Sequence, residues 1–352
     1  MDVIKWYIEN QPTYKRLSSK VESLLSEVFE IENISYHIVT FRTKSIDSVR
    51  DKVSKGKYSK PIEQIQDFSG IRIITYVEDE IEKICEIIEK TFNIDNANSS
   101  NKSEALGIDK VGYKSIHYVA SLDKSRLKLP EYKQYIGKCF EIQVRTILQH
   151  AWAEIEHDRN YKFTGKLPLD IGRRFKILAG VLEMADREFN NISNEIDVIA
   201  KSTLENTKKG NLNIPINSTT LNQYLNTKFS SVFKDKDEII PDTTKNLIHE
   251  IETFGLYTLA DFDAIISKDI ELALIKLKAK VGSIYESGLV RRILIVHDYD
   301  KYFSQIVDAE DTDEFPWAWT TPDTEEEERE FFHECGIDWS KIEKKYNAFI
   351  AF

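Results

Sequence analysis

Two carboxylates lie beside strand-like runs of the sequence, where they could hold a divalent cation. Asp67 comes just before the β-branched run 70–77, and Glu141 lies inside the run 139–145. Mg²⁺ in proteins takes one or two carboxylates and fills its other positions with water and phosphate oxygens. Taken singly, each residue favours a surface salt bridge, but the ordered set of carboxylates and bases predicts a site for magnesium and a polyphosphate. These bases are Arg42, Lys44, Lys52, Arg72 and Arg145.

Alternation along two predicted strands places several polar side chains on one face of each. In 139–145, Glu141, Gln143 and Arg145 point away from the apolar side chains. In 113–119, Tyr113 and His117 share a face. In a fully buried sheet these polar groups would have no function, so we expect both faces to line a cleft.

The elements expected to position these residues alternate between strands and helices up to about residue 145. Apolar periodicity predicts the strands 35–41, 70–77, 113–121 and 139–145, and the helices 12–31, 45–54, 78–92, 146–158 and 169–200. The polar run 94–111 is typical of a mobile loop. The last helix carries a long apolar stripe, interpreted as core packing: Ile171, Phe175, Leu178, Leu182, Ala185, Phe189, Ile192 and Ile196.

The pattern changes after this helix. Residues 201–220 are polar and contain Gly210 and Pro215, which is typical of a linker. Helical segments follow around 219–233, 243–254, 259–266 and 269–286, and the run 291–296 is a strand candidate. We therefore predict two domains, residues 1–205 and residues 206–352.

Four ordered motifs resemble the synthetase domain of RelA/SpoT-type alarmone synthetases, in particular the small single-domain members. They are the stretches 42–52, 67–72, 112–117 and 141–146, and the stretch 150–162 is similar as well. The resemblance covers roughly residues 10–200. It implies an α/β (α+β) fold, with a nucleotidyltransferase-like mixed β-sheet flanked by helices and followed here by a mostly helical C-terminal domain.

The resemblance also implies a role for each matching residue. Asp67 and Glu141 match the catalytic carboxylates that hold Mg²⁺, and Glu141 also matches the group that activates the acceptor hydroxyl. Tyr113 matches the aromatic residue that stacks on guanine. The positions that match ATP-binding residues are Arg42, Lys44, Ser48, Lys52 and Arg72, and those that match acceptor-binding residues are His117, Gln143, Arg145 and His150.

The implied reaction is the transfer of pyrophosphate from ATP to the 3′-hydroxyl of GTP or GDP, which makes the stringent-response alarmone (p)ppGpp and releases AMP. One alternative is a toxic relative that modifies the 3′ end of tRNA, with the C-terminal domain as inhibitor or phage sensor. Another is an inactive nucleotide-sensing module. About 40 residues precede Arg42, too few for a hydrolase domain, so we expect synthesis only. Phe41 stands where relatives often have glycine, a departure on the ATP side.

Composition and charge complete the expectations. The 352 residues contain three cysteines and no apolar run near ~18 residues, which predicts a cytoplasmic protein without a membrane segment. Residues 307–334 carry twelve acids and one base, a net charge equal to the −11 of the whole chain, whereas 42–60 carries seven bases and two acids. The C-terminal domain could therefore cover the basic segment as an intramolecular regulator. A stabilising domain, or one that forms a homo-oligomer, is equally compatible.

Overall fold

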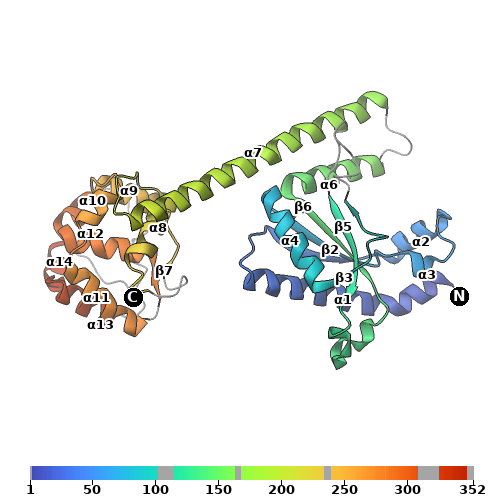
Figure 1. Ribbon diagram of the computed structural model, residues 1–352, viewed down its shortest axis with the longest axis horizontal. Coiled ribbons are helices and arrows are strands. Elements are labelled where there is room, and N and C mark those ends of the chain that lie inside the picture. The colour runs from blue at the N-terminus through green and yellow to red at the C-terminus, as the bar shows by residue number, and fades with distance from the viewer. Residues whose placement is uncertain are drawn as a thin grey trace. The chain divides into compact units, whose positions relative to one another are not determined.

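The chain divides after Ser193 into two units, each with its own apolar core (Figure 1). The structure, a computed structural model, describes residues 2–101, 115–162, 168–233, 239–281, 283–307 and 325–346. The boundary predicted at 205/206 and the division after Ser193 lie in the same helix, α7 (Leu169–Lys208).

A mixed β-sheet forms the centre of the first unit, as predicted. Its strands are β1 (Ile38–Thr43), β2 (Ser69–Thr75), β6 (Phe140–Thr146), β5 (Ile116–Leu122) and β3 (Phe92–Ile94), in that spatial order, with β4 (Ser100–Asn101) also paired to β5. β2 and β6 run parallel, whereas the pairs β1–β2, β5–β6 and β3–β5 are antiparallel. Both strands that carry the candidate carboxylate motifs are thus central and adjacent.

Helices cover the apolar face of this sheet. Ile71 and Ile73 of β2 and Ile142 of β6 are fully buried in one cluster with residues of α1 (Val3–Ile31) and α4 (Glu78–Thr91). Burial of such aliphatic side chains contributes roughly 1.5–3 kcal/mol each. The other face carries the polar side chains, and α6 (Ile147–Lys162) packs against β2 and β6. The remaining helical elements of the unit are α2 (Ile46–Ser54), α3 (Pro61–Gln64), η1 (Arg126–Lys128) and η2 (Pro130–Tyr135).

The predicted mobile loop 94–111 contains a short strand. β4 pairs with β5 through Ser100 opposite His117, because the chain turns back at Asp95, whose carboxylate accepts backbone N–H bonds from Ala97 and Asn98. Residues 102–114 lie outside the described residues, and with them Tyr113.

Helix α7 departs from its prediction in two ways. It continues to Lys208, so the linker predicted over 201–220 is wrong for its first eight positions. The apolar stripe is also not core packing at Leu178, Phe189, Ile192 and Ile196, whose exposed fractions lie between 45% and 55%. An apolar helical repeat shows that a face needs a partner, but it does not say which one.

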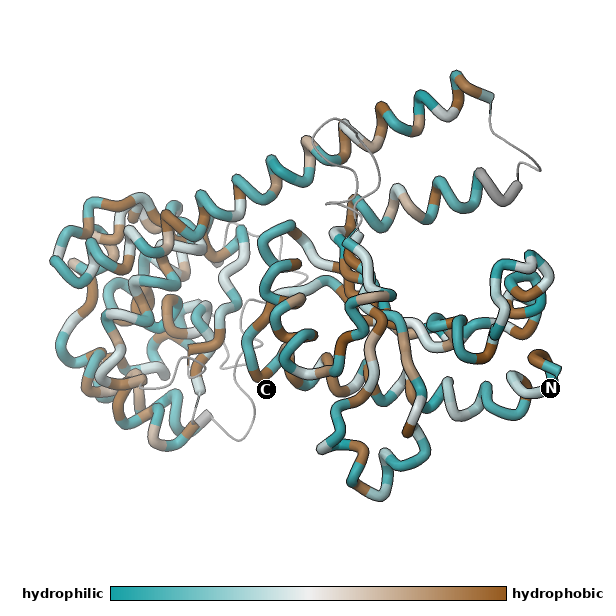
Figure 2. The backbone as a smooth tube through the Cα atoms, turned by 45° about the vertical axis from the view of Figure 1, so that its right-hand side comes forward, coloured by the Kyte–Doolittle hydropathy of each residue, from teal (hydrophilic) through white to brown (hydrophobic). Residues whose placement is uncertain are grey.

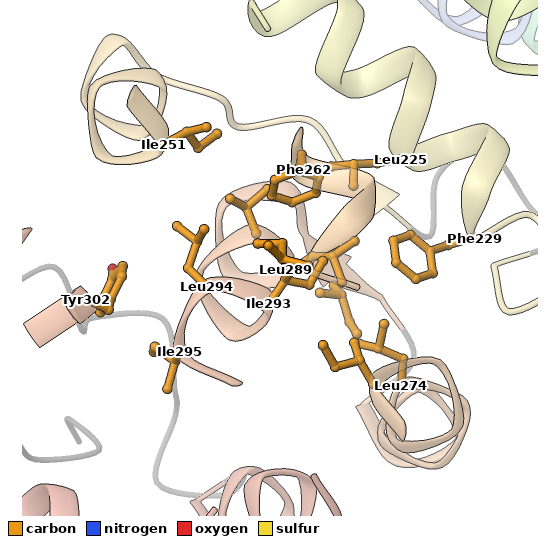
Figure 3. Close-up of a cluster of buried hydrophobic side chains, with 14 of the residues drawn as sticks. Leu225, Phe229, Ile251, Phe262, Leu274, Leu289, Ile293, Leu294, Ile295 and Tyr302 are labelled. Carbon is orange, nitrogen blue, oxygen red and sulfur yellow. The ribbon is translucent and has the colours of Figure 1, made fainter. Parts of the chain in front are cut away.

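The second unit is mostly helical, as predicted. Its elements are α8 (Ser218–Lys228), β7 (Ile239–Ile240), α9 (Lys245–Thr253), α10 (Leu259–Ala264), α11 (Lys268–Val281), β8 (Ile284–Tyr285), α12 (Glu286–Tyr302), η3 (Phe303–Val307), α13 (Glu325–Glu334) and α14 (Trp339–Tyr346). Leu289, Ile293 and Leu294 of α12 lie at the centre of its core (Figure 3). The strand predicted over 291–296 is wrong, because this run is part of α12. No helix in the described ranges is long and apolar enough to span a bilayer.

Candidate active site

A cleft of about 420 Å³ lies over the polar face of the sheet. Strands β1, β2 and β6, helix α2 and the segment before β2 supply most of its walls. Its lining consists of Arg42, Lys44, Ser48, Asp51, Lys52, Lys55, Asp67, Gly70, Ile71, Arg72, Glu141, Gln143 and His157. The structure thus gathers in one cleft all five residues predicted for ATP and both predicted metal ligands.

Strand pairing explains how distant residues reach the same cleft. Gly70 and Arg72 of β2 lie opposite Glu141 and Gln143 of the parallel neighbour β6. On the other side of β6, Gln143 lies opposite His117 of β5. Side chains in register on neighbouring strands share a face, so the two polar faces predicted from alternation are one continuous surface.

Two lysines hold the Asp67 carboxylate. Lys44 donates to Asp67 Oδ2 at 2.7 Å, and Lys52 donates to Oδ1 at 2.8 Å and to Oδ2 at 2.9 Å. Burial acts to raise the pKa of Asp67, but the hydrogen bonds and charges of Lys44 and Lys52 outweigh it and lower that pKa below its usual value. The carboxylate is therefore ionised at neutral pH.

Glu141 is held by its strand neighbours. Its Oε1 atom lies 2.8 Å from His117 Nδ1, and its Oε2 atom accepts a hydrogen bond from Gln143 Nε2 at 2.9 Å. Burial and the charge of Asp67 act to raise the pKa of Glu141, whereas the hydrogen bonds and charge from His117 and Gln143 lower it, and the net shift is downward. The charge of Asp67 thus acts on Glu141, which agrees with their position in the same cleft.

His117 does not line the cleft but supports it. Its Nδ1 atom faces Glu141, while its Nε2 atom is buried and has no hydrogen-bond partner within the described residues. The Ser115 hydroxyl is also buried and also has no hydrogen-bond partner within the described residues. Buried polar atoms without partners are costly, so these groups favour a polar ligand near this end of β5.

Arg145 and His150 lie around Glu154 of α6 and are not part of the cleft lining. Glu154 lies 3.0 Å from Arg72, 3.5 Å from Arg145 and 3.9 Å from His150. Burial, together with the charge of Arg145, lowers the pKa of His150, so its ring is neutral at pH 7. Their roles in acceptor binding stay predictions, as does that of Tyr113.

Helix α2 contributes lining residues that the sequence analysis missed. Asp51, Lys52 and Lys55 follow Ser48 by three, four and seven positions, in α2 and at its C-cap. That spacing places them on one face and could have pointed to Asp51 and Lys55. His157 of α6 also lines the cleft; it belongs to the stretch 150–162 that resembles the family, but no role in the site was predicted for it, nor for the lining residues Gly70 and Ile71.

Phe41 leaves the cleft backbone unaltered. It lies in β1 opposite Ile71, one position from Arg42, so its side chain points to the opposite face of the sheet. Among the described residues, Asn33 is the only non-glycine residue with a positive φ. A glycine is therefore not required at position 41 for backbone reasons.

The donor set of the cleft fits Mg²⁺. Asp67 and Glu141 are two ionised carboxylates within one cleft, and Mg²⁺ needs no more from a protein when phosphates and water complete its octahedron. Within the described part of the chain, no cluster of three or more His, Cys, Asp or Glu residues is placed to hold a metal ion unaided. The cleft thus suits a metal that arrives with a phosphate ligand.

Comparison with known proteins finds relatives of the first unit. Residues 41–166 match the model of the region found in RelA and SpoT proteins. This part of the chain is therefore a RelA/SpoT domain, and it contains every residue that lines the cleft. The second unit lies beyond the match.

The relatives that match are small enzymes. GTP pyrophosphokinase YjbM of Bacillus subtilis is 26% identical over 185 residues, which cover 52% of this chain and 83% of that protein. GTP pyrophosphokinase YwaC of the same organism is 28% identical over 170 residues, which cover 44% and 73%. The crystal structure of small alarmone synthetase 1 from B. subtilis matches with a TM-score of 0.46 and 25% identity, over 55% of this chain and 98% of that one. In sequence, the first unit is thus similar to two GTP pyrophosphokinases over most of their length.

Proposed function

We propose that the first unit is a pyrophosphokinase that transfers the β,γ-pyrophosphate of ATP to the 3′-hydroxyl of GDP or GTP. The homologous B. subtilis proteins are GTP pyrophosphokinases. The observation that carries the proposal is the meeting of Asp67 and Glu141 in one cleft with a set of bases. These bases are Arg42, Lys44, Lys52, Lys55 and Arg72.

The division of charge within the cleft matches the needs of this transfer. ATP brings four negative charges, and phosphoryl-type transfer depends mainly on positioning and on neutralising that charge. Arg42 and Arg72 offer planar guanidinium groups that can bind phosphate oxygens in pairs, and the lysines act as point charges. The triphosphate therefore belongs beside α2 and the bases of β1 and β2.

Glu141 is the general base in this proposal, and the lowered pKa of its carboxyl supports the role because it keeps the group ionised. In the proposed step the acceptor 3′-oxygen bonds to the β-phosphorus of ATP, and the bond from that phosphorus to the α,β-bridging oxygen breaks. AMP leaves with the bridging oxygen, and the hydroxyl proton passes to the Glu141 carboxylate. His117 and Gln143 hold that carboxylate through one oxygen each, which fixes its orientation toward the hydroxyl.

Asp67 and Glu141 would hold Mg²⁺, which when bound neutralises phosphate charge and orients the triphosphate. Lys44 and Lys52, which here donate to Asp67, lie where they can pair with phosphate oxygens. The acceptor base is expected near His117 and Ser115, whose buried polar atoms favour a polar ligand there.

The test incubates the full-length protein with ATP labelled in its γ-phosphate, MgCl₂, and GDP, GTP or deacylated tRNA in separate reactions. We expect labelled guanosine product from GDP or GTP. Label on tRNA alone would replace the guanosine acceptor with the tRNA 3′ end. No transfer to any acceptor would reject the proposed activity.

Matched variants assign the chemistry to the cleft. Glu141→Gln keeps the shape of the side chain and should lower kcat by about 10²–10⁴-fold, the usual contribution of a general base. Asp47→Asn is the control, because Asp47 lies on α2 with 83% of its side chain exposed and pairs with Arg50 outside the cleft lining. Equal turnover of Glu141→Gln and wild type would remove Glu141 from the mechanism.

A further inference from the structure

Helix α1 carries two hydrogen-bond donors that reach the edge of the cleft from behind. Tyr7 and Gln11 lie four positions apart, so their side chains leave the helix on the same face. The Tyr7 hydroxyl donates to the backbone carbonyl of Lys44 at 2.5 Å, and Gln11 Nε2 donates to the same oxygen at 3.1 Å. Burial raises the pKa of Tyr7 to about 12, so its hydroxyl stays protonated and able to donate. A carbonyl oxygen has two lone pairs, and α1 supplies a donor for each.

Lys44 lies at the joint between β1 and α2. β1 ends at Thr43 and α2 begins at Ile46, so only Lys44 and Ser45 connect the two elements. In Figures 1 and 2 the start of α1, marked N, lies beside α2, and the two helices are in contact. The peptide unit is planar, so a carbonyl held by two donors fixes the plane that joins Lys44 to Ser45, here called the 44–45 joint. The direction in which α2 leaves β1 depends on that plane.

Residues predicted to bind the triphosphate lie on both sides of the 44–45 joint. Lys44 precedes it, whereas Ser48 and Lys52 follow it on α2. Lys44 and Lys52 meet again at Asp67, to which Lys44 donates at 2.7 Å and Lys52 at 2.8 and 2.9 Å. This convergence requires one particular direction of α2, because the helix carries Lys52. The joint therefore sets the spacing of the bases that face the nucleotide.

Tyr7 also contacts the segment that carries Asp67. Its ring stacks on that of Phe68, the residue after Asp67, with the ring centroids 4.9 Å apart and the planes at 25°. Phe68 in turn accepts a backbone hydrogen bond from Lys44 at 3.0 Å. Tyr7 and Phe68 are 0% and 1% exposed, and close packing of such buried rings limits their movement. One side chain thus holds Lys44 through its hydroxyl and the neighbour of Asp67 through its ring.

We propose that Tyr7 and Gln11 are positioning residues of the ATP site, which act on the nucleotide through the 44–45 joint. The inference rests on the proposed function, because that function assigns the triphosphate to Lys44, Ser48 and Lys52. Neither Tyr7 nor Gln11 is part of the cleft lining, so we assign them no contact with the nucleotide. They hold the bases in place before ATP arrives, which reduces the ordering that binding otherwise requires.

Binding of an uncleavable nucleotide tests the proposal separately from turnover. The probe is α,β-methylene-ATP with MgCl₂, titrated into the full-length protein in a calorimeter. Tyr7→Phe removes one donor and keeps the ring that stacks on Phe68, and the Kd of the nucleotide should rise about 3–10-fold, as for the loss of one hydrogen bond. Adding Gln11→Met, which keeps a side chain of similar length without a donor, should raise the Kd roughly 10–100-fold over wild type.

Tyr14→Phe is the matched control. Tyr14 is buried on the same helix, and its ring packs against Phe68 at a centroid distance of 5.2 Å. The substitution removes a hydroxyl from this aromatic cluster but leaves both donors to Lys44 in place, so we expect the wild-type Kd. A loss of folded protein would lower the binding stoichiometry without changing the Kd, and the same titration therefore separates a positioning effect from a loss of fold.

Steady-state turnover gives a second measurement. The KM for ATP should rise in Tyr7→Phe, whereas the KM for GDP should not change, because the 44–45 joint connects residues of the ATP side. A variant that merely contained less folded protein would lower the apparent kcat and leave both KM values as in wild type.

Three results would overturn the proposal. One is an unchanged Kd in the variant that combines Tyr7→Phe with Gln11→Met. Another is an equal rise of the Kd in Tyr14→Phe, which would assign the effect to aromatic packing. The third is an equal rise of both KM values in Tyr7→Phe, which would show a general loosening of the site.

Failure of the proposed function gives a different result. Wild-type protein that does not bind the nucleotide would reject the proposed function and this inference together. Wild-type protein that binds the nucleotide but transfers no pyrophosphate would reject only the proposed reaction, and the comparison of Kd values would still decide the role of Tyr7 and Gln11.

Discussion

His117 and Gln143 each donate a hydrogen bond to Glu141, and these bonds decide how the carboxylate titrates. Burial and the Asp67 charge alone would raise the pKa of Glu141, and the two donors reverse that shift. A base with a lowered pKa is ionised above that pKa and loses its function as the pH falls through it. Removal of His117 should therefore move the acid limb of the pH–rate profile to higher pH.

We predict this upward movement for His117→Ala, measured as kcat against pH from 4 to 8. His117→Gln keeps an N–H donor and should move the limb less. A variant that merely loosened the fold would lower kcat at all pH values without moving the limb. An acid limb at the wild-type position in His117→Ala would show that Glu141 does not depend on His117.

Strand alternation made most of these cleft residues predictable. Glu141 and Gln143 had to share a face once their strand was placed, because alternation has a period of two; His117 joins them through the register of β5 and β6. Arg145 obeys the same period but is tied to Glu154, a contact decided by the packing of α6. His157 lies in the stretch 150–162 that resembles the family, but its place in the cleft lining depends on how α6 lies over the sheet, which strand alternation does not give.

At the scale of elements, α12 shows how a correct apolar run can be assigned the wrong structure. Residues 291–296 are short and β-branched, and such a run is equally compatible with a strand or a buried helix. α12 is a buried helix, with Val290, Ile293 and Ile295 all at 0% exposure. Periodicity cannot separate the two cases because a helix buried all round has no polar face.

Helix α12 also forms a buried ion pair with α13, and we expect this pair to stabilise the second unit. Arg292 of α12 and Glu328 of α13 form two hydrogen bonds, with side chains 6% and 3% exposed. Glu328→Ala should destabilise this unit by about 3–5 kcal/mol, since it removes one partner of a buried ion pair. Urea unfolding followed by hydrogen exchange in peptides of α12 and α13 measures the change.

Glu330→Ala provides the control on the same helix. Glu330 pairs with Lys280 of α11 at an exposed position, where ion pairs contribute little, so this variant should unfold close to wild type. Equal losses in both variants would show that α13 is held by charge in general and not by the buried pair.

At the scale of the whole molecule, two groups can be separated among the twelve acids of residues 307–334. Glu328, Glu330 and Glu334 on α13 pair with Arg292, Lys280 and Lys276 inside the second unit. The sequence 308–314 adds five acids and no base: Asp308, Glu310, Asp311, Asp313 and Glu314. The three paired acids of α13 are thus neutralised locally, whereas the five acids of 308–314 form a dense group that is a candidate to oppose ATP at the basic cleft.

Replacing these five acids with the matching amides should lower the KM for ATP at low salt. A general field effect is screened beyond a Debye length of ~10 Å at 0.1 M salt, so it should change KM by less than about twofold under those conditions. A segment that covers the bases of the cleft should change KM more, and that larger change should shrink toward wild type as salt is raised. Steady-state kinetics between 20 and 500 mM KCl measure the KM and its salt dependence.

Glu252→Gln with Asp269→Asn is the control, since both acids are exposed in the same unit. A KM equal to wild type at every salt concentration would leave the acidic segment without a part in ATP binding.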